Sequence, residues 1–395
     1  MLVRQLALRD FRNYREADVS LEPGPNLFVG SNGQGKTNLV EALGYLSTLG
    51  SHRVSTDQAL IRQDQPSAVI RARLQHDGRE KLVEVELNRV GANRAQVNRS
   101  VVKTRELPRY FSSVLFAPED LALVRGDPSG RRRFLDQLLV LRAPRLSGVL
   151  ADYERVLKQR NSLLKSARAT GAKAASLTTL DIWDERLVAL GSEIIAARSR
   201  LLAELAPHVR SGYAAVAGAD HGPTLVASLS VLGADPDEDE QQGSAPADSM
   251  TPEDLANPAA IAVRYSAALQ RLRRRELDRG ITLAGPHRDD VVFALNGLPA
   301  KGYASHGESW SFALALKLAS AEILRRESAS GDPVLILDDV FAELDESRRI
   351  RLADAIADYE QVLITAAVYG DVPEGLRAHT VRISAGSIVD EAADD

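Results

Sequence analysis

Apolar and polar residues alternate in several stretches of the N-terminal region. The alternation predicts strands with one buried face at residues 2–8, 68–75 and 81–89. The last two are expected to form a hairpin around Asp77-Gly78, because an Asp-Gly pair suits a tight two-residue turn. A further strand is expected near residues 95–97.

Three shorter runs are apolar at nearly every position, at residues 26–29, 334–337 and 361–364. Such runs predict strands of a buried sheet, and the last two suit parallel strands covered on both faces. From Lys36 to about Leu49 the pattern becomes helical. The sequence therefore predicts an α/β sheet domain whose strands come from both ends of the chain.

Apolar residues at helical spacing fill the middle of the chain, at residues 146–163 and 187–201. Residues 166–179, rich in Ala, Gly, Ser and Thr, separate the two stretches. We predict a helical hairpin with about five turns in each arm. Two amphipathic helices on an ordinary core explain this pattern as well as a projecting coiled coil does.

Composition narrows the classes of protein. The chain has no cysteine, which excludes disulfides, zinc thiolate sites and cysteine nucleophiles. The segment Met1–Asp10 is interrupted by charges and does not resemble a signal peptide. No stretch approaches the ~20 apolar residues that span a membrane. We therefore expect a soluble, cytoplasmic protein with no membrane partner.

The formal charge of −5 is unevenly distributed. Residues 235–254 contain eight Asp or Glu and no Lys or Arg, whereas residues 125–173 contain twelve Lys or Arg and four Asp or Glu. A chain that is acidic overall can still present a basic face to phosphates. The acidic stretch is poor in large apolar residues, so residues 233–258 are predicted to form a disordered surface insertion.

One segment matches the phosphate-loop pattern G-x-x-x-x-G-K-[ST], between a predicted strand and a predicted helix. Its glycines let backbone N–H groups turn toward a phosphate, and the following helix adds its positive N-terminal end. Lys36 is predicted to contact the β- and γ-phosphates of ATP, and the Thr37 hydroxyl to bind Mg²⁺. The predicted nucleotide-binding residues are Gly30, Ser31, Asn32, Gly33, Gln34, Gly35, Lys36, Thr37 and Asn38.

Two carboxylates end a distant predicted strand. Asp338 and Asp339 follow the apolar run 334–337. Asp338 is predicted to hold Mg²⁺, directly or through water, and Asp339 to act as the general base on the attacking water. A solvated strand end explains such a pair taken alone, but the segment Phe341–Asp345 that follows it favours the catalytic interpretation.

Asp338 lies 302 positions after Lys36. A nucleotide site whose halves flank a helical hairpin is the layout of the SMC-like ABC ATPase heads. Such a head also needs a helix that opens with a serine and contacts the γ-phosphate on a second subunit, a contact predicted for Ser305 and Gly307. The pattern Ser305-x-x-Glu308 is equally a capping box, and the two interpretations are compatible.

The predicted fold is α/β, a P-loop ABC-type ATPase head with a helical-hairpin second lobe. Residues 1–120 and 281–395 are expected to form the ATPase lobe, and residues 121–280 the helical arm lobe. The predicted cofactors are ATP and Mg²⁺.

Several strings resemble one family in order and spacing, over nearly the whole chain outside about 210–275. They are Phe11–Tyr14, Gly30–Asn38, Phe116–Leu121, Arg131–Asp136, Asp152-Tyr153, Gln159–Asn161, Gly285–Asp290, Tyr303–Gly307 and Leu337–Asp345. The set is similar to the RecF family. That resemblance implies a weak, DNA-stimulated ATPase that dimerises on ATP and binds duplex DNA and junctions with single-strand gaps. It also implies RecR and RecO as partners in loading RecA during recombinational repair.

The resemblance also implies roles by position. Arg12 and Asn13 resemble the strip near the adenine and the α-phosphate. Gly50–Arg53 resembles the arginine loop of SMC-like heads, with Arg53 as the nucleotide contact. Ala342–Asp345 matches the loop that faces the partner subunit across the dimer.

The sequence departs from the broader ABC pattern at several positions. Glu308 stands where a glutamine is usual. Asp339 is one methylene shorter than the usual glutamate, which predicts slow turnover. Thr365 replaces a switch histidine and is expected only to hydrogen-bond the γ-phosphate, and no Q-loop glutamine is evident near Phe116–Asp120.

Basic runs supply the candidates for DNA binding. Contacts to phosphates are expected to be salt-dependent and largely independent of sequence. Solvated helix faces explain the same runs equally well. The candidates are Arg131, Arg132, Arg133, Lys158, Arg160, Lys165, Arg168, Arg271, Arg273, Arg274 and Arg275.

Two other functions fit part of the pattern. The ATPase subunit of a transporter would carry a switch histidine, a glutamine loop and a shorter gap between the halves of the site, and none of these is evident. A structural binding module with a relic nucleotide site would have no need of intact Lys36, Thr37, Asp338 and Asp339.

Overall fold

The computed structural model describes residues 1–170, 178–233, 250–328 and 331–389. The chain divides into two compact units, each built from separate segments. The head unit comprises Met1–Val124, His208–Pro223 and Ala304–Asp395, and the arm unit comprises Arg125–Pro207 and Thr224–Tyr303. Residues 208–223 thus belong to the head, although the predicted limits place them in the helical arm lobe. Residues 281–303 belong to the arm, although the predicted limits place them in the ATPase lobe.

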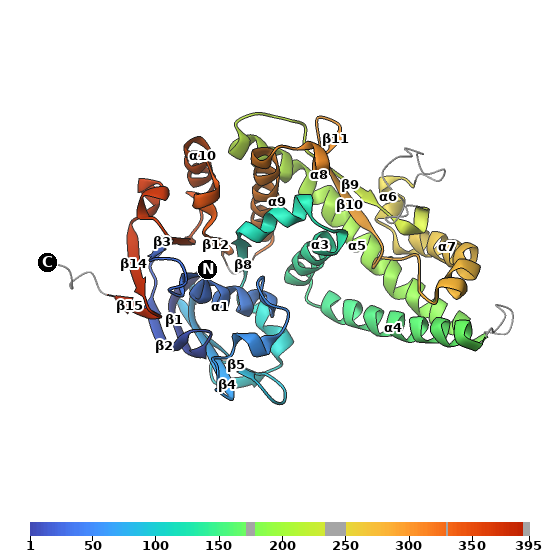
Figure 1. Cartoon of the computed structure of the whole chain (residues 1–395), viewed down its shortest axis with the longest axis horizontal. Helices are drawn as coiled ribbons and strands as arrows, with labels where there is room; N and C mark the ends of the chain where they lie inside the picture. Colours follow the sequence, from blue (N-terminus) through green and yellow to red (C-terminus); the bar gives the residue numbers. More distant parts are fainter. Residues whose placement is uncertain (171–177, 234–249, 329–330, 390–395) are drawn as a thin grey trace. The chain divides into compact units, whose positions relative to one another are not determined.

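An antiparallel sheet of the head unit has the strand order β2-β1-β4-β5-β6-β7 (Figure 1). Its strands alternate buried and more exposed positions, as the predicted pattern requires. The predicted hairpin and its third strand are confirmed, and Asp77 and Gly78 both have positive φ at the turn. The strands are β1 (Leu2–Phe11), β2 (Tyr14–Ser20), β4 (Ser67–His76), β5 (Arg79–Asn88), β6 (Arg94–Val97) and β7 (Ser100–Val102).

The second sheet of the head has the order β15-β14-β3-β13-β12-β8, and all of its strands except β15 run parallel. The two runs predicted as buried parallel strands are the neighbours β12 and β13. Every residue in these two strands is buried, as expected where both faces of a sheet are covered. The strands are β3 (Gly24–Val29), β8 (Ser113–Phe116), β12 (Val334–Asp338), β13 (Gln361–Ala366), β14 (His379–Ser384) and β15 (Ser387–Val389).

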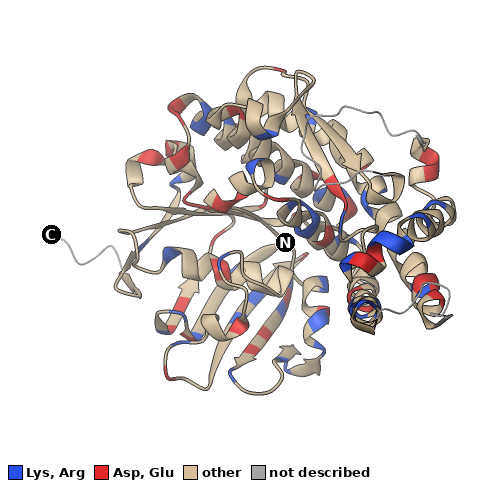
Figure 2. Ribbon diagram, turned by 45° about the vertical axis from the view of Figure 1, so that its right-hand side comes forward, with Lys and Arg blue, Asp and Glu red and all other residues tan. Residues whose placement is uncertain are grey.

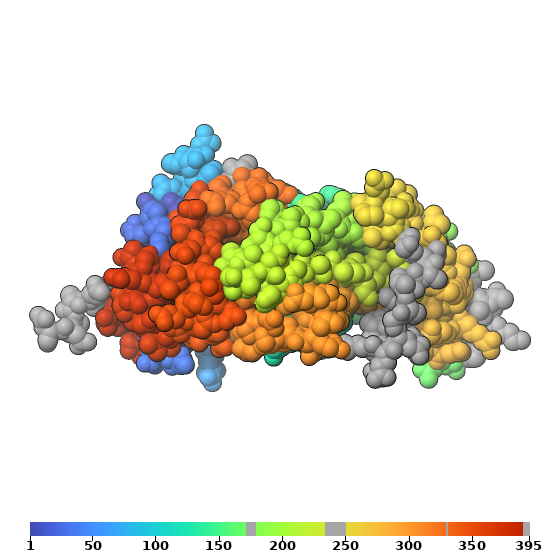
Figure 3. Space-filling model, turned by 90° about the horizontal axis from the view of Figure 1, so that it is seen from above, coloured from blue at the N-terminus to red at the C-terminus, as the bar shows by residue number. Residues whose placement is uncertain are grey.

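Helices cover the sheets of the head. Helix α1 (Lys36–Thr48) contacts strands of both sheets and lies between them. Helix α9 (His306–Glu327) packs against β8 and is buried from Ser309 almost to its end. Arg351 of α10 (Glu346–Ile356) donates from Nε to Val216 O at 2.9 Å, so the head segment 208–223 lies beside α10 (Figure 3). The short elements are η1 (Asp57–Leu60), η2 (Thr104–Arg109), η3 (Pro118–Asp120), α2 (Leu121–Arg125), η6 (Val340–Glu343), η7 (Tyr369–Asp371) and η8 (Glu374–Leu376).

The arm unit combines long helices with a three-stranded antiparallel sheet of order β11-β10-β9. The two helices predicted as a hairpin are α4 and α5, with 25 and 40 residues instead of about five turns each. Residues 166–170 extend α4 although the sequence predicts a separator there, because alanine favours a helix. The elements are α3 (Pro128–Arg142), α4 (Leu146–Thr170), α5 (Thr178–Ala217, ending in the head), α7 (Pro258–Arg279), α8 (Ala300–Tyr303), β9 (Thr224–Ser228), η5 (Ser230–Leu232), β10 (Asp290–Leu295) and β11 (Leu298–Pro299).

The arm helices share one apolar core. Tyr153 of α4, Leu187 and Ile194 of α5, and Tyr265 and Leu269 of α7 belong to a single buried cluster. A projecting two-stranded coiled coil would leave α4 and α5 without such a third helix. The structure therefore favours the alternative in which two amphipathic helices cover an ordinary core.

The acidic stretch lies between η5 and α7. Residues 234–249 of the predicted disordered insertion are outside the described residues. Its last part corrects the prediction, because residues 250–258 contain α6 (Pro252–Leu255) and the start of α7. Thr251 and Asn257 cap these helices with their side chains, each before a proline. The prediction from overall composition overlooked these local start signals.

Candidate nucleotide site

Three parallel strands of the head unit end at one edge of their sheet. Strand β3 leads into the phosphate loop (residues 30–37), β12 ends at Asp338, and β13 places Thr365 opposite Asp338. Ligands of parallel α/β sheets bind at the carboxyl ends of the strands. The Thr37 hydroxyl donates to Asp338 Oδ1 at 3.0 Å, so the two halves predicted from distant parts of the sequence are in contact.

The phosphate loop has a shape that requires its glycines. Gly33 and Gly35 have φ of 81° and 115°, in the left-handed region that side chains disfavour. A Cβ on Gly30 would lie 2.2 Å from the Ile383 carbonyl oxygen of β14. Helix α1 begins at Lys36 without a side-chain cap, which leaves its first N–H groups suited to a phosphate. The Lys36 side chain donates from Nζ to Ser31 O at 3.2 Å.

The turn between β1 and β2 supports the phosphate loop. Asn13 donates from Nδ2 to Gln34 O at 3.2 Å and accepts from Asn38 Nδ2 at 2.7 Å. A Cβ on Gly35 would lie 2.7 Å from the Tyr14 hydroxyl and 2.8 Å from Asn13 Nδ2, so only glycine fits here. Asn13 thus contacts the loop itself, and its predicted place near the nucleotide stays a prediction.

Arg12 is engaged inside the head unit. Its guanidinium forms a two-point ion pair with Glu41 of α1, at 2.8 Å and 2.6 Å. Glu41 is fully buried and was not predicted as part of the site, although a carboxylate on the apolar side of α1 is a visible signal. Arg53 donates to Asn38 Oδ1 at 3.0 Å, so the predicted arginine loop lies beside the phosphate loop.

Asp338 is buried and accepts two hydroxyl hydrogen bonds on one oxygen. Thr365 donates to Asp338 Oδ1 at 2.6 Å, in addition to the bond from Thr37. The Thr365 hydroxyl also accepts from the backbone N–H of Asp339 at 2.9 Å. The expectation that Thr365 could only bond the γ-phosphate is therefore wrong, since this side chain orients the carboxylate pair.

Asp339, the predicted general base, is held in an unusual backbone conformation beside Asp338. Its backbone is left-handed, with φ of 52°, and its Oδ1 is enclosed without a hydrogen-bond partner among the described residues. Burial raises the pKa of Asp339, and the negative charge of Asp338 raises it further, while Lys36 opposes the shift. A raised pKa makes the carboxylate a better proton acceptor.

The helix α9 opens with the predicted capping box. Ser305 Oγ accepts from Glu308 N at 3.3 Å, and Glu308 Oε2 accepts from Ser305 N at 2.8 Å. Ser305 is exposed, which is compatible with a contact to a second copy but does not test it. The Arg348 guanidinium packs against Gly307. A Cβ on Gly307 would lie 2.8 Å from it.

The structure assigns Glu308 a role within its own chain. Its carboxylate caps the helix and lies 3.5 Å from Nδ1 of His221, which also bonds the Tyr213 hydroxyl at 2.9 Å. The bonds from Ser305 lower the pKa of Glu308, which favours the carboxylate form. Tyr213 and His221 belong to the head segment His208–Pro223, and no local sequence pattern indicates this contact.

The loop predicted to face a partner subunit is tied to the same helix. Asp345 caps α10 by accepting from Arg348 N at 2.9 Å, and it forms an ion pair with the Arg348 guanidinium. Arg348 Nε donates to Ser311 Oγ of α9 at 3.2 Å. One arginine therefore joins the two elements that are predicted to meet the second subunit.

Two predicted DNA-binding residues are buried ion-pair partners in the arm unit. Arg131 bonds both oxygens of Asp290, at 2.7 Å and 2.8 Å. Arg160 is completely buried and bonds Asp184 and Glu276 at 2.6 Å and 2.7 Å. These bonds correct the prediction for both arginines, because a buried guanidinium needs its carboxylates. In the same set Arg133, Lys158, Lys165, Arg168, Arg271, Arg274 and Arg275 are exposed, whereas Arg132 and Arg273 are partly buried.

The burial of Arg160 gives a testable difference from its neighbour Lys158, which is exposed on the same helix. Arg160→Ala is expected to lower the free energy of unfolding by about 3–5 kcal/mol, because it leaves Glu276 buried without its partner. Lys158→Ala, the matched control, is expected to stay within about 0.5 kcal/mol of wild type. Urea denaturation measures both. Equal stabilities of the two variants would contradict the structural role of Arg160.

The string Gly285–Asp290 also serves the arm core. His287 Nδ1 lies 2.7 Å from the Tyr153 hydroxyl, and burial lowers the pKa of His287 to about 3. Asp289 accepts from the N–H and the hydroxyl of Ser230 at 2.9 Å and 2.7 Å. This string therefore joins α4, η5 and β10 within the arm.

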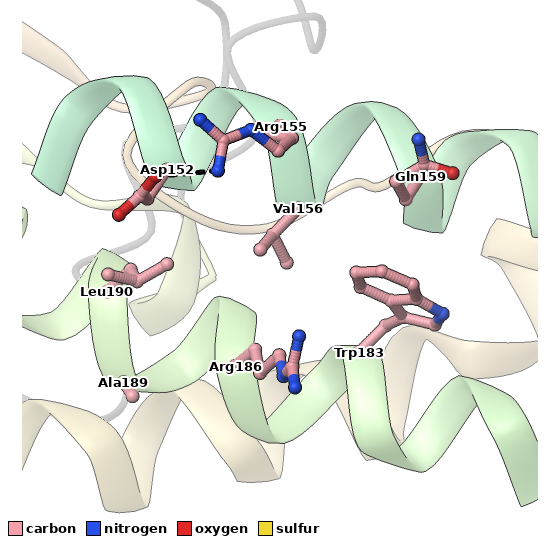
Figure 4. Close-up of a pocket in the computed structure, with 8 residues that line it drawn as sticks. All are labelled: Asp152, Arg155, Val156, Gln159, Trp183, Arg186, Ala189 and Leu190. Carbon is pink, nitrogen blue, oxygen red and sulfur yellow. Dashed lines mark ion pairs between the residues drawn. The ribbon is translucent and has the colours of Figure 1, made fainter. Parts of the chain in front are cut away.

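A groove of about 520 Å³ lies between α4 and α5 in the arm unit (Figure 4). Val156 points into it, and the Arg186 guanidinium lies 5.8 Å from the centre of the Trp183 ring. Arg155 on its edge forms an ion pair with Asp152 at 2.9 Å. Basic and acidic residues are interspersed along the arm helices (Figure 2). The groove itself is lined by charges of both signs, from Asp152, Arg155 and Arg186, so its charge does not select one kind of partner.

The site and its sheet first define the class of protein: a P-loop protein with the fold of an ABC-type ATPase head. A family model described as RecF/RecN/SMC N terminal domain matches residues 2–384. The Smc head domain of Pyrococcus furiosus aligns over 98% of this chain and 95% of its own, with a TM-score of 0.51 and 14% identity, and supports the fold alone. The predicted fold class is confirmed.

Closer relatives define the family. The DNA replication and repair protein RecF of Clavibacter sepedonicus is 69% identical over 99% of this chain and 95% of the relative, and that of Leifsonia xyli is 64% identical over 99% and 100%. A solved structure described as RecF-ATPrS in the RecFOR pathway has a TM-score of 0.84 at 28% identity, covering 99% of this chain and 98% of the other. This chain belongs to the RecF family, as its motifs predicted.

No helix among the described residues is both long and apolar enough to cross a membrane.

Proposed function

We propose that this chain is an ATP-dependent DNA-binding protein of recombinational repair and a slow ATPase. The contact between Thr37 of the phosphate loop and Asp338 carries the proposal, because it joins a phosphate-binding loop to a metal-binding carboxylate. Relatives are named for DNA replication and repair, and two similar structures are described as RecF with ATP and with ATPrS. Work on chromosomal DNA would place the protein in the cytoplasm.

The residues present suit a magnesium ion. A hydroxyl and a carboxylate are hard oxygen donors of the kind Mg²⁺ prefers, and Thr37 and Asp338 supply them. Asp338 Oδ1 already accepts two hydrogen bonds, whereas its Oδ2 accepts none from a described residue. When bound, the ion would neutralise charge on the β- and γ-phosphates.

The proposed chemistry is attack of water on the γ-phosphorus of ATP, which releases ADP and phosphate. Asp339 accepts the proton of that water, and its enclosed, unpartnered Oδ1 supports this role. Lys36 places its charge on the phosphates. Turnover is expected to be slow, because the aspartate is one methylene shorter than the glutamate usual at this position.

We propose that two copies of the chain close around ATP. Ser305 and the Gly307 N–H of one copy would contact the γ-phosphate held by the other. The exposed start of α9 and the link that Arg348 makes to Asp345 support this proposal.

DNA would bind through its phosphates. The exposed basic residues of α3, α4 and α7 remain the candidates, and RecR, with RecO and RecA in the same pathway, remains the proposed partner. Duplex DNA and single-strand gap junctions are the proposed substrates.

An electrophoretic shift of gapped DNA, with and without ATP and at two salt concentrations, tests the function. We expect binding that requires ATP and weakens about 1,000-fold or more between 50 and 200 mM salt, as for a protein with several phosphate contacts. ATP hydrolysis should rise when DNA is added. Hydrolysis that ignores DNA would favour a transporter-type ATPase, and DNA binding that ignores ATP would favour a relic nucleotide site.

A further inference from the structure

His52 lies beside the metal-binding carboxylate of the proposed site. Its Nε2 is 3.7 Å from Asp338 Oδ2. That nitrogen is enclosed and has no hydrogen-bond partner among the described residues. The distance is about half an ångström beyond hydrogen-bond range, so the two atoms face each other without a formed bond.

An enclosed polar atom without a partner costs about 1–3 kcal/mol, so its presence needs a reason. A second such atom, Asp339 Oδ1, belongs to the residue next to Asp338. Two such atoms, one facing Asp338 and one on the next residue, indicate a site built to hold further polar groups.

The place of His52 is fixed by the loop that carries it. Ser51 Oγ accepts from the backbone N–H groups of Arg53 and Val54, at 2.9 Å and 3.1 Å. The same hydroxyl donates to Glu41, which is fully buried on α1 and bound to Arg12. The Arg12–Glu41 pair therefore anchors the loop that directs His52 at Asp338.

The two oxygens of Asp338 have different surroundings. Oδ1 accepts from the Thr37 and Thr365 hydroxyls, at 3.0 Å and 2.6 Å. Oδ2 faces His52. The hydroxyls fix one side of the carboxylate, and the His52 imidazole lies 3.7 Å from the other.

We propose that His52 is a positioning residue for the divalent cation. In the tautomer with the proton on Nε2, the imidazole donates to Asp338 Oδ2, directly or through a water, and holds the carboxylate in the orientation that the cation requires. Hydrogen bonds of this kind to a metal-binding carboxylate commonly contribute 10- to 100-fold to metal affinity. The inference rests on the proposed nucleotide function.

Calorimetric titration of Mg²⁺ into the ADP-bound full-length protein tests the proposal without relying on turnover. His52→Leu keeps the bulk of the side chain and removes the donor, and we expect its Kd for Mg²⁺ to rise about 10-fold or more. His52→Gln places an N–H near the position of Nε2, and its Kd should lie within about threefold of wild type. ADP affinity in EDTA should be unchanged in both variants, and circular dichroism should show that both are folded.

His76→Leu is the matched control, since His76 lies on β4 and pairs with Asp77 away from the site. Wild-type Mg²⁺ affinity in His52→Leu would overturn the inference. So would a His52→Gln variant as weak as His52→Leu, since the N–H would then have no part in binding. Failure of the wild-type protein to bind ADP at all would instead contradict the proposed function.

Discussion

Lys36→Ala is expected to abolish ATP binding, with affinity falling about 100-fold or more. Its ammonium would form charge-assisted bonds to two phosphates, each worth roughly 1.5–3 kcal/mol. The side chain is 3% exposed and lies along the phosphate loop at Ser31, so it is already placed for this contact. No other lysine of the chain lies in that loop.

Fluorescence titration with a labelled ATP analogue measures this loss. Lys81→Ala, at an exposed position of β5, removes the same charge from the antiparallel sheet and is expected to bind as wild type does. Circular dichroism establishes that both variants are folded. Retained affinity in Lys36→Ala would refute the nucleotide site at this sheet edge.

Ser305→Arg is expected to bind ATP normally and to remain a monomer when ATP is added. A long cation at the start of α9 would obstruct the γ-phosphate contact proposed between two copies. The nucleotide of the same copy is expected to bind unaffected, because its proposed ligands lie in the phosphate loop and at the ends of β12 and β13. Light scattering with and without ATP measures the oligomeric state.

A second variant separates the contact from the helix cap. Ser305→Arg removes the capping box, at a cost of about 1 kcal/mol, whereas Ser305→Asp keeps a good cap and introduces a negative charge. Both variants should fail to dimerise if Ser305 meets a phosphate of the other copy. An ATP-dependent dimer of Ser305→Arg would refute the composite site.

Local patterns explain why much of the head was predictable. The phosphate loop, the apolar strand before Asp338 and the capping box at Ser305 are each encoded by neighbouring residues. The phosphate loop and Asp338 meet at one sheet edge because the carboxyl ends of parallel strands lie together there. The sequence therefore predicted the principal residues of the site and the strands that carry them.

The missed features depend on partners that are distant in the sequence. Arg160 looks like an exposed base in an arginine-rich helix, and only the fold brings Glu276, 116 positions away, against it. The contact of His221 with Glu308 likewise spans two segments of the head. Local periodicity predicts which face of a helix is buried but not which charged groups meet there. Ion pairs and unpartnered buried atoms such as His52 Nε2 could therefore be identified only in the structure.

The central place of β3 has a consequence for synthesis on the ribosome. Both of its neighbours, β13 and β14, come from the last part of the chain and begin 332 and 350 residues after β3 ends. At a translation rate of about 5–20 residues per second, both edges of β3 therefore remain unpaired for roughly 15–65 s after it is synthesised. The first antiparallel sheet can form early, but the nucleotide pocket cannot assemble until translation is nearly complete.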